Sequence, residues 1–309
     1  MNNQTQSSNI IFGPVPSRRF GISLGIDLSP DTKQCNFDCL YCELKAAKTV
    51  DSMSHYPSVE EILNAVKNKL QSSTSKIEVL TLTANGEPTL YPYLKELVTS
   101  LKTLNKEIKL LILSNGSTIY KRKVQEALLD IDIVKLSLDC VSKECFNKLD
   151  RPHKSVEVDK IVTGMVEFQK IFKNELVLEI LFVKSLNNKN KEIELLKNAI
   201  KEIKPSRVDL STIDRPPAYK VEAISFEELE EIASKLDYPY INIAHKHRPI
   251  FEATYSKDEI LALLQRRPLS KFDIEHTFSN SSRSFLNELI DDKKVEIIDS
   301  SGVEFYKIP

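Results

Sequence analysis

Short apolar runs alternate with amphipathic helical segments through the first two thirds of this chain, and this alternation limits the folds available to it. Strand-like runs cover residues 22–27, 77–83, 108–114, 133–138, 176–183 and 207–211. Helix-like spacing of apolar residues covers residues 58–71, 93–103, 121–129, 156–172 and 189–203. Several strand runs are apolar at almost every position, as in parallel strands that are covered on both faces. We therefore predict an α/β fold of βα units, either a (β/α) barrel or a doubly wound open sheet, with ligands at the carboxyl ends of the strands.

The pattern changes after Arg215-Pro216-Pro217. A helix is predicted at 226–236 and a short apolar run at 241–244. The Ser256-x-x-Glu259 capping box predicts the start of another helix. Two more helices are predicted at 271–278 and 282–290, followed by a hairpin at 295–305. Three helices followed by a hairpin resemble a winged-helix domain. We therefore expect a disordered tail at residues 1–8, a barrel at 9–220 and a small winged-helix-like α+β domain at 221–309.

Composition and cysteine content bound the setting of the protein. Hydrophobic residues make up 41% of the 309 residues, yet no stretch approaches the ~18 uninterrupted apolar residues of a membrane span. Five cysteines without an apolar N-terminal signal segment argue against a secreted disulfide framework. We expect a cytoplasmic protein that has no membrane partner. We also expect Cys140 and Cys145 to be structural, because cysteine often serves as a small buried hydrophobe; hydrogen-atom donation or a second cluster is the alternative.

Three cysteines lie close together at Cys35, Cys39 and Cys42, in a C-x3-C-x2-C spacing. Three thiolates suit a 4Fe-4S cluster, whose four irons then include one that has no protein ligand and is open to chemistry. The same three positions would share one face of a helix, but Asn36 and Asp38 interrupt the apolar run. A zinc ion would need a fourth ligand, and the nearest histidine lies thirteen residues beyond the last cysteine. The spacing therefore favours the cluster.

This spacing, with Tyr41 directly before the last cysteine, resembles the signature of the radical S-adenosylmethionine (SAM) superfamily. The resemblance implies a partial (β/α)6 TIM-type barrel and a 4Fe-4S cluster on the three catalytic cysteines, with the amino and carboxylate groups of SAM on the open iron. It also implies a flavodoxin or ferredoxin electron donor and reductive cleavage of SAM to a 5′-deoxyadenosyl radical. The run GPVPSRRFGISLGIDLSP, together with Arg215-Pro216-Pro217, resembles a subgroup of uncharacterised Fe-S oxidoreductases related to the tRNA wyosine-synthase-like enzymes.

Polar residues at the ends of the predicted strands match further parts of the superfamily pattern. Gly86-Glu87-Pro88 resembles the Gly-Gly-Glu-like element that holds the SAM amino group, with Asn85 in place of the first glycine. An ordinary Asn-Gly turn is the alternative there. The resemblance also implies that Asn115, Ser137 and Asp139 reach the ribose and methionine parts of SAM, although such residues also cap helices.

An aromatic residue and several arginines complete the candidate site. Tyr41 corresponds to an aromatic that the superfamily uses near the adenine, and core filling is its alternative role. Because guanidinium groups bind carboxylates and phosphates in bidentate fashion, we single out Arg215 as a ligand of the SAM carboxylate or of an anionic substrate. Arg18, Arg19 and Arg151 are considered with it. A solvated surface position is the alternative for each arginine.

Charge is unevenly distributed along the chain. Residues 221–309 carry 11 Lys/Arg against 17 Asp/Glu, whereas residues 1–220 carry 32 against 27. The positive N-terminal part favours an anionic substrate, so RNA modification is the first substrate hypothesis and peptide modification the second. A function of another class is an Fe-S redox sensor whose winged helix binds nucleic acid. The third predicted helix of that domain and the segment to Lys294 carry no net charge, which disfavours DNA binding, and a simple sensor would not need polar strand ends.

Overall fold

The computed structural model describes residues 10–17, 20–73, 75–243, 251–300 and 302–309. The predicted tail at residues 1–8 lies outside these ranges, as do Arg18, Arg19 and the last residue of the predicted apolar run at 241–244. Within the described ranges, no helix combines the length and the hydrophobicity needed to cross a lipid bilayer.

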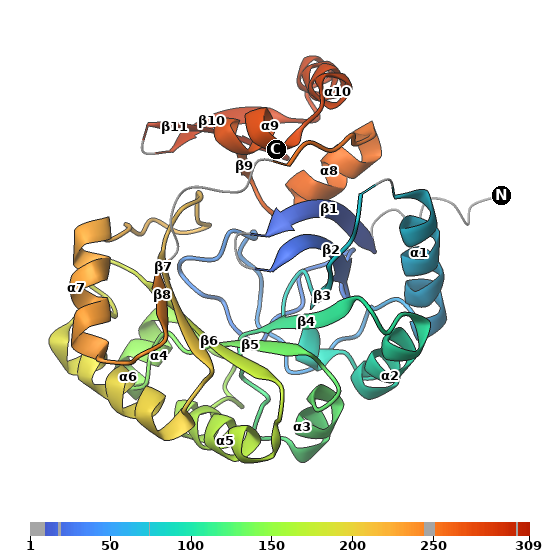
Figure 1. Ribbon diagram of the computed structural model, residues 1–309. Coiled ribbons are helices and arrows are strands. Elements are labelled where there is room, and N and C mark those ends of the chain that lie inside the picture. Colours follow the sequence, from blue (N-terminus) through green and yellow to red (C-terminus); the bar gives the residue numbers. More distant parts are fainter. Residues whose placement is uncertain (1–9, 18–19, 74, 244–250, 301) are drawn as a thin grey trace.

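One eight-stranded sheet forms the body of the molecule, and its strands lie side by side in chain order (Figure 1). The strands are β1 (Ile11–Ser17), β2 (Gly21–Asp27), β3 (Val79–Thr83), β4 (Lys109–Ser114), β5 (Ile133–Ser137), β6 (Glu175–Phe182), β7 (Arg207–Thr212) and β8 (Ile241–Ile243). Strands β2 to β8 are parallel, and β1 pairs antiparallel with β2. A doubly wound sheet would reverse its strand order at a switch point, and this sheet does not. The expected partial barrel is therefore present.

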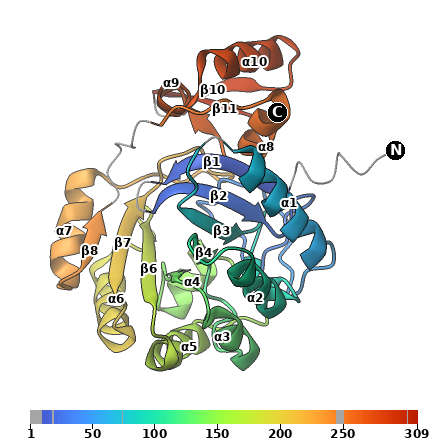
Figure 2. The ribbon, with the colours of Figure 1, turned by 45° about the vertical axis from the view of Figure 1, so that its right-hand side comes forward.

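Helices follow the strands and cover the outside of the barrel (Figure 2). They are α1 (Val59–Ser72), α2 (Leu94–Leu104), α3 (Arg122–Leu128), α5 (Val158–Ile171), α6 (Asn190–Ile203) and α7 (Phe226–Leu236). The buried face of α6 is formed by Ile193, Leu196, Ile200 and Ile203, whose spacing of three and four residues places them on one side of the helix. The short α4 (Lys143–Leu149) lies instead against the loop that follows β2, where the N–H of Leu40 donates to its last carbonyl (2.9 Å).

Two strands and one short helix of the barrel were not predicted as such from the sequence. Strand β1 contains Gly13, Pro14 and Pro16, which sequence rules penalise, but an edge strand tolerates missing N–H donors. Strand β8 has only three residues, and it extends the barrel sheet beyond residue 220 by pairing with β7. Helix α4 has only seven residues, too few for a clear apolar period.

The interior of the barrel changes from apolar to polar along the strands. Toward the amino ends, Val79, Leu111, Ile133 and Val177 form a buried cluster, with Phe20 packed against it. Side chains on a strand point to the same face at every second position. The inward positions two residues further along are Thr81, Leu113, Lys135 and Glu179. Hydrocarbon therefore fills the amino end of the barrel, and polar groups gather toward the carboxyl ends of the strands.

The C-terminal unit, residues 251–309, has its own small sheet and hydrophobic core. Its elements are α8 (Lys257–Arg266), β9 (Leu269–Ser270), α9 (Lys271–Thr277), α10 (Asn280–Asp291), β10 (Glu296–Ser300) and β11 (Val303–Lys307). The antiparallel sheet has the order β10-β11-β9, and the capping box of Ser256 and Glu259 begins α8 as predicted. Tyr255, Leu263 and Phe278 belong to the core. The three helices and the hairpin are present, and the unit lies against β1 (Figures 1 and 2).

Candidate active site

The three free cysteines lie in the long loop between β2 and α1, residues 28–58. The start of this loop pairs with the segment after β3. The N–H of Gln34 donates to the carbonyl of Asn85 (2.9 Å), and the N–H of Glu87 donates to the carbonyl of Gln34 (3.0 Å). Gly86 has a φ of +137°, and a Cβ there would lie 1.9 Å from the Gln34 carbonyl oxygen. Only glycine therefore allows this contact, which sets the first cysteine beside the glycine-containing turn.

Two other distant segments hold the rest of the cysteine run. The N–H of Leu40 donates to the carbonyl of Leu149 (2.9 Å), and the N–H of Ala218, just after the Arg-Pro-Pro run, donates to the carbonyl of Cys42 (2.8 Å). The loop itself contains no helix and no strand in the described chain. Its conformation is therefore set by segments that lie far away in the sequence.

Each free thiol has a polar neighbour. The contacts are the N–H of Phe37 to Sγ of Cys35 (3.4 Å), Nζ of Lys33 to Sγ of Cys42 (3.4 Å), and Sγ of Cys39 to the Asp150 carboxylate (3.7 Å). Burial raises the pKa of the Cys35 thiol to about 12, with a smaller effect from the Glu87 carboxylate. Burial, followed by the Asp150 carboxylate, raises the pKa of the Cys39 thiol well above its usual value. A bound cation would reverse this preference, because ligation stabilises the thiolate.

The spacing of the thiols fits a cluster better than a single metal ion. Within the described residues, the only Cys, His or carboxylate ligand atoms that gather in a group of three within 4.8 Å belong to Cys140, Cys145 and Glu192. The three free thiols therefore do not all lie within 4.8 Å of one another, as the ligands of one zinc ion would, since Zn–S bonds are about 2.3 Å long. Sulfur ligands and wide spacing both suit a 4Fe-4S cluster.

A cavity of about 180 Å³ opens beside two of the thiols at the carboxyl ends of the strands. Among the residues predicted from the sequence, those that line it are Cys35, Cys39, Gly86, Glu87, Asn115 and Ser137. The lining residues that were not predicted are Phe37, Leu113, Ser114, Lys135 and Glu179. The side-chain amide of Asn115 donates to Asn36 (2.9 Å) and lies 3.7 Å from the Cys35 sulfur. Most of the predicted site residues therefore meet in one place.

Glu87 lies at the cavity wall, but its carboxylate is already engaged by protein donors. The hydroxyls of Thr89 (2.5 Å) and Ser114 (2.7 Å) and the N–H groups of Thr89 (3.0 Å) and Asn115 (2.7 Å) all donate to it. Burial raises the pKa of this carboxyl, and the same hydrogen bonds oppose the rise. The side chain therefore ties the turn after β3 to the end of β4. Pro88 follows it, buried at the start of a 3-10 turn (Pro88–Leu90), and does not line the cavity.

Tyr41 and Asp139 do not line the cavity; they contact each other. The Tyr41 hydroxyl donates to the Asp139 carboxylate, which also accepts the N–H of Leu181 (2.6 Å). Burial raises the pKa of Asp139 to about 7. Asp139 lies beyond the last residue of β5, so strand alternation no longer determines its direction. Here both side chains join the cysteine loop to the end of β5.

Arg215 lies near the cysteine loop and likewise does not line the cavity. Its side chain is mostly buried, and Nη1 contacts Glu43 (3.1 Å), the residue after Cys42, and Asp214 (3.4 Å). Arg151 contacts Asp38 of the same loop (3.0 Å). In this structure the two guanidinium groups contact carboxylates of the protein.

Cys140 and Cys145 form a disulfide in the structure, and both are buried. Neither lines the cavity. This is one bridge over a separation of five residues, and no framework of disulfides joins the described chain. The nearby Glu192 carboxylate accepts the N–H of Ser142 (3.0 Å) and its hydroxyl (2.6 Å), which fixes the start of α4.

The sequence did not predict that the charged side chains of Lys135, Glu179 and Asp209 meet inside the barrel. Nζ of Lys135 lies 2.6 Å from the Glu179 carboxylate and 3.4 Å from that of Asp209, although its side chain is only 7% exposed. The Glu179 side chain is 31% exposed and faces the cavity with Lys135. A charge in the middle of an otherwise apolar strand was the available signal, since burial of an ionic group is costly unless it is paired.

Comparison with known proteins agrees with this geometry. Residues 29–196 match the radical SAM superfamily. The chain is 43% identical over 301 residues to a UPF0026 protein of Helicobacter pylori (strain ATCC 700392 / 26695), and the match covers 96% of this chain and 97% of that protein. A radical SAM methyltransferase from Sphaerobacter thermophilus shares the fold, with a TM-score of 0.58 and 10% identity over 72% of this chain and 65% of that one. Archaeal TYW1 is more distant, with a TM-score of 0.46 and 12% identity over 93% of this chain and 78% of that one. The chain belongs to the radical SAM superfamily and to the UPF0026 family.

Proposed function

We propose that this radical SAM enzyme holds its 4Fe-4S cluster on Cys35, Cys39 and Cys42 and cleaves SAM there in order to modify RNA. Membership of the superfamily gives the two cofactors, the cluster and SAM. Bound together, they supply a 5′-deoxyadenosyl radical that removes a hydrogen atom from the substrate. The observation that carries the assignment is a set of three free thiols in one loop, which do not all lie within 4.8 Å of one another and two of which line a cavity at the strand ends.

The chain's own residues would prepare this cavity in three ways. Because the Glu87 carboxylate is already engaged by hydroxyl and N–H donors, we assign the SAM ammonium to the backbone carbonyls of the same turn. Asn115 and Ser137 offer side-chain donors and acceptors at the wall and would bind polar groups of SAM. Phe37 and Leu113 add apolar surface that would limit the access of water.

Lys135 and Glu179 would orient a polar group of the substrate. They are a charged pair at the wall of the cavity, and the Glu179 side chain keeps about a third of its surface exposed. A preformed ion pair can bind a polar group without reorganising, because its members already hold fixed positions.

An external electron donor of the flavodoxin or ferredoxin type completes the proposal. In the described chain only three cysteines are free, so no second cluster of its own is available. Free thiols in the site fit a reducing compartment such as the cytoplasm.

RNA is the first substrate hypothesis because residues 1–220 carry 32 Lys/Arg against 27 Asp/Glu. The sequence resemblance to the tRNA wyosine-synthase-like enzymes supports it, and a peptide is the alternative.

We propose that the C-terminal unit is a winged-helix-like domain. It begins after β8, since α7 and β8 still belong to the barrel. Superfamily membership favours an enzyme over the redox-sensing regulator.

The test uses protein reconstituted anaerobically with iron and sulfide and then reduced with dithionite. With SAM alone, the wild type is expected to form 5′-deoxyadenosine and methionine in equal amounts, and Cys39→Ala is expected to form neither. A Cys140→Ala/Cys145→Ala variant removes the two disulfide-bonded cysteines, which do not line the cavity, and should retain the activity. Stoichiometric zinc without iron, or no product from the wild type, would contradict the proposal.

Substrate class is tested in the same assay. Total tRNA and a tryptic digest of cell protein are added separately, and the rate of 5′-deoxyadenosine formation is measured. Faster formation with tRNA alone supports RNA, whereas faster formation with the digest alone would assign the enzyme to peptides.

A further inference from the structure

Asp27, the last residue of β2, organises the two loops that form the candidate site. Its Oδ1 accepts the N–H of Ser29 (2.9 Å), at the start of the cysteine loop, and the N–H of Asn85 (2.9 Å), directly before Gly86. The residue is 1% exposed. One buried carboxylate therefore fixes both the segment that leads to the thiols and the turn that lies beside them.

The cation that faces this carboxylate comes from the C-terminal unit. Nε of Arg266, the last residue of α8, lies 3.0 Å from Oδ2 of Asp27, and the Arg266 side chain is only 10% exposed. The guanidinium also stacks over the Phe12 ring, 4.8 Å from its centre, and Nη1 donates to the carbonyl of Ala262 (2.6 Å). These contacts fix the orientation of the Arg266 guanidinium and its N–H donors. The two loops that Asp27 holds therefore depend on a residue of the C-terminal unit.

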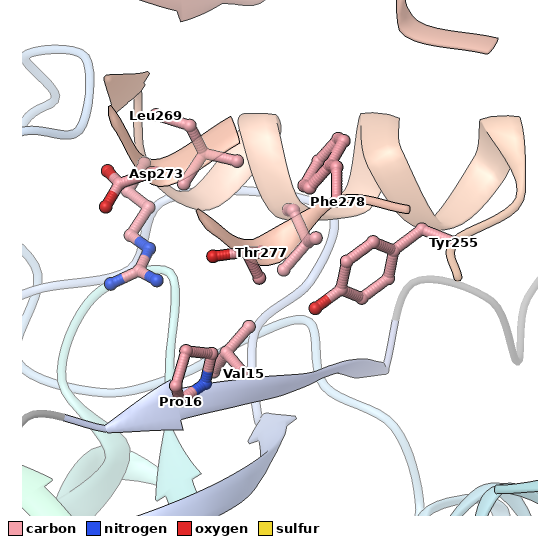
Figure 3. A pocket seen from close by; sticks show the side chains of 9 residues that line it. Val15, Pro16, Tyr255, Leu269, Asp273, Thr277 and Phe278 are labelled. Carbon is pink, nitrogen blue, oxygen red and sulfur yellow. The ribbon is translucent and has the colours of Figure 1, made fainter. Parts of the chain in front are cut away.

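The C-terminal unit is anchored in a way that delivers Arg266 to this position. Figure 3 shows Tyr255, Leu269 and Phe278 of the unit facing Val15 and Pro16 of β1 across a small, mainly apolar pocket. The Tyr255 hydroxyl, which is buried, donates to the carbonyl of Pro14 (2.6 Å). Strand β1, whose prolines made it unrecognisable as a strand, is thus the platform on which the unit docks.

We propose that Arg266 is a positioning residue of the active site, which acts through Asp27 to hold the cysteine loop and the Gly86 turn in place. This inference rests on the proposed function of that site. A buried ion pair contributes little net stability compared with apolar packing, but loss of one partner leaves the other charge uncompensated. Without Arg266, the Asp27 carboxylate would have to change its hydrogen bonds or gain a proton, and either change disturbs the two N–H donors from the loops.

The experiment compares Arg266→Met, Arg266→Lys and the control Lys69→Met in the full-length protein. Lys69 of α1 pairs with Glu259 of α8, so the control removes another ion pair between the barrel and the same helix without touching the site. Arg266→Met is expected to lower kcat/KM for SAM roughly 10- to 100-fold, mainly through KM, because a small displacement of the turn beside the cavity misplaces the bound SAM. Arg266→Lys should recover part of this loss, and Lys69→Met should stay within about twofold of the wild type.

A second measurement does not require the loaded enzyme. Hydrogen exchange of the metal-free protein should show faster exchange of the Ser29 and Asn85 N–H groups in Arg266→Met than in Lys69→Met. Arg266→Met/Asp27→Asn removes both charges and keeps an acceptor oxygen for the two donors, so exchange protection and KM should return toward wild-type values.

Three results would overturn the inference. They are wild-type kcat/KM and exchange in Arg266→Met, equal losses in Lys69→Met, and no recovery in the double variant. If the wild type forms no 5′-deoxyadenosine, the proposed function fails, and the exchange data still decide whether Arg266 positions the loops.

Discussion

Gly86→Ala is the substitution for which the structure gives the sharpest expectation. A Cβ at this position would lie 1.9 Å from the carbonyl oxygen of Gln34 and 2.3 Å from its carbonyl carbon, and the φ of +137° is unfavourable for alanine. Gln34 cannot move freely, because its N–H and carbonyl bond to Asn85 and Glu87. The backbone strain costs about 1–3 kcal/mol. Loss of the two hydrogen bonds adds about 1 kcal/mol each, so we expect the free energy of unfolding to fall by about 3–5 kcal/mol.

Cluster content reports this local damage more directly than global stability. The damage lies beside Cys35, so iron per chain after anaerobic reconstitution should fall together with the urea midpoint. The control is Gly302→Ala, since Gly302 also has a positive φ (+78°), but a Cβ added there would meet no atom within 4 Å. It should cost only about 1–2 kcal/mol and leave the iron content unchanged. If Gly86→Ala kept both the iron and the stability of the wild type, the close contact between the two loops would not exist in solution, and the reasoning would be refuted.

Two further substitutions test the charged groups around the cavity. Lys135→Met removes a cation that Glu179 and Asp209 share. Asp209 keeps its ion pair with Arg207 (2.9 Å) and the Glu179 side chain is 31% exposed, so we expect the free energy of unfolding in urea to fall by about 1–3 kcal/mol, with partial recovery in Lys135→Met/Glu179→Gln; an unchanged free energy of unfolding would contradict this. Burial raises the pKa of Asp139 from 3.8 to about 7, so between these values the folded chain keeps a proton that the unfolded chain releases, and stability falls as pH rises through that window. Asp139→Asn should flatten this slope by up to about 1.4 kcal/mol per pH unit, and an unchanged slope in urea titrations from pH 4 to 7 would exclude Asp139 as its source.

The strand ends show how far sequence reasoning reached. Parallel βα order predicts that residues at the carboxyl ends of neighbouring strands converge, and Asn115 and Ser137 do lie at one cavity with Cys35. The same argument fails for Asp139, because it lies beyond β5 and tertiary contacts turn it toward Tyr41. The pairing of a loop residue with a distant tyrosine leaves no local pattern in a sequence.

Residues inside the strands were harder to find. Lys135 and Glu179 belong to strands that were predicted from their many apolar residues. That pattern does not show which charged side chains contact each other across the barrel. The pairing depends on the register of β5 and β6, where Lys135 lies opposite Val177 and Ser137 opposite Glu179. Register is set by the assembled sheet, so this part of the site required the structure.

The cysteine loop connects these observations in one physical argument. Residues 28–58 form a connection far longer than most in compact domains, without regular structure of their own. Such a loop gains order only from contacts that are distant in sequence, and here they come from Asn85, Leu149, Ala218 and, through Asp27, Arg266. The last of these lies in the C-terminal unit, so the contacts that hold the loop extend to the unit that docks on β1. Damage to any of these four polar contacts should therefore appear first as loss of the cluster and only later as loss of the barrel, whose core is held together by apolar packing.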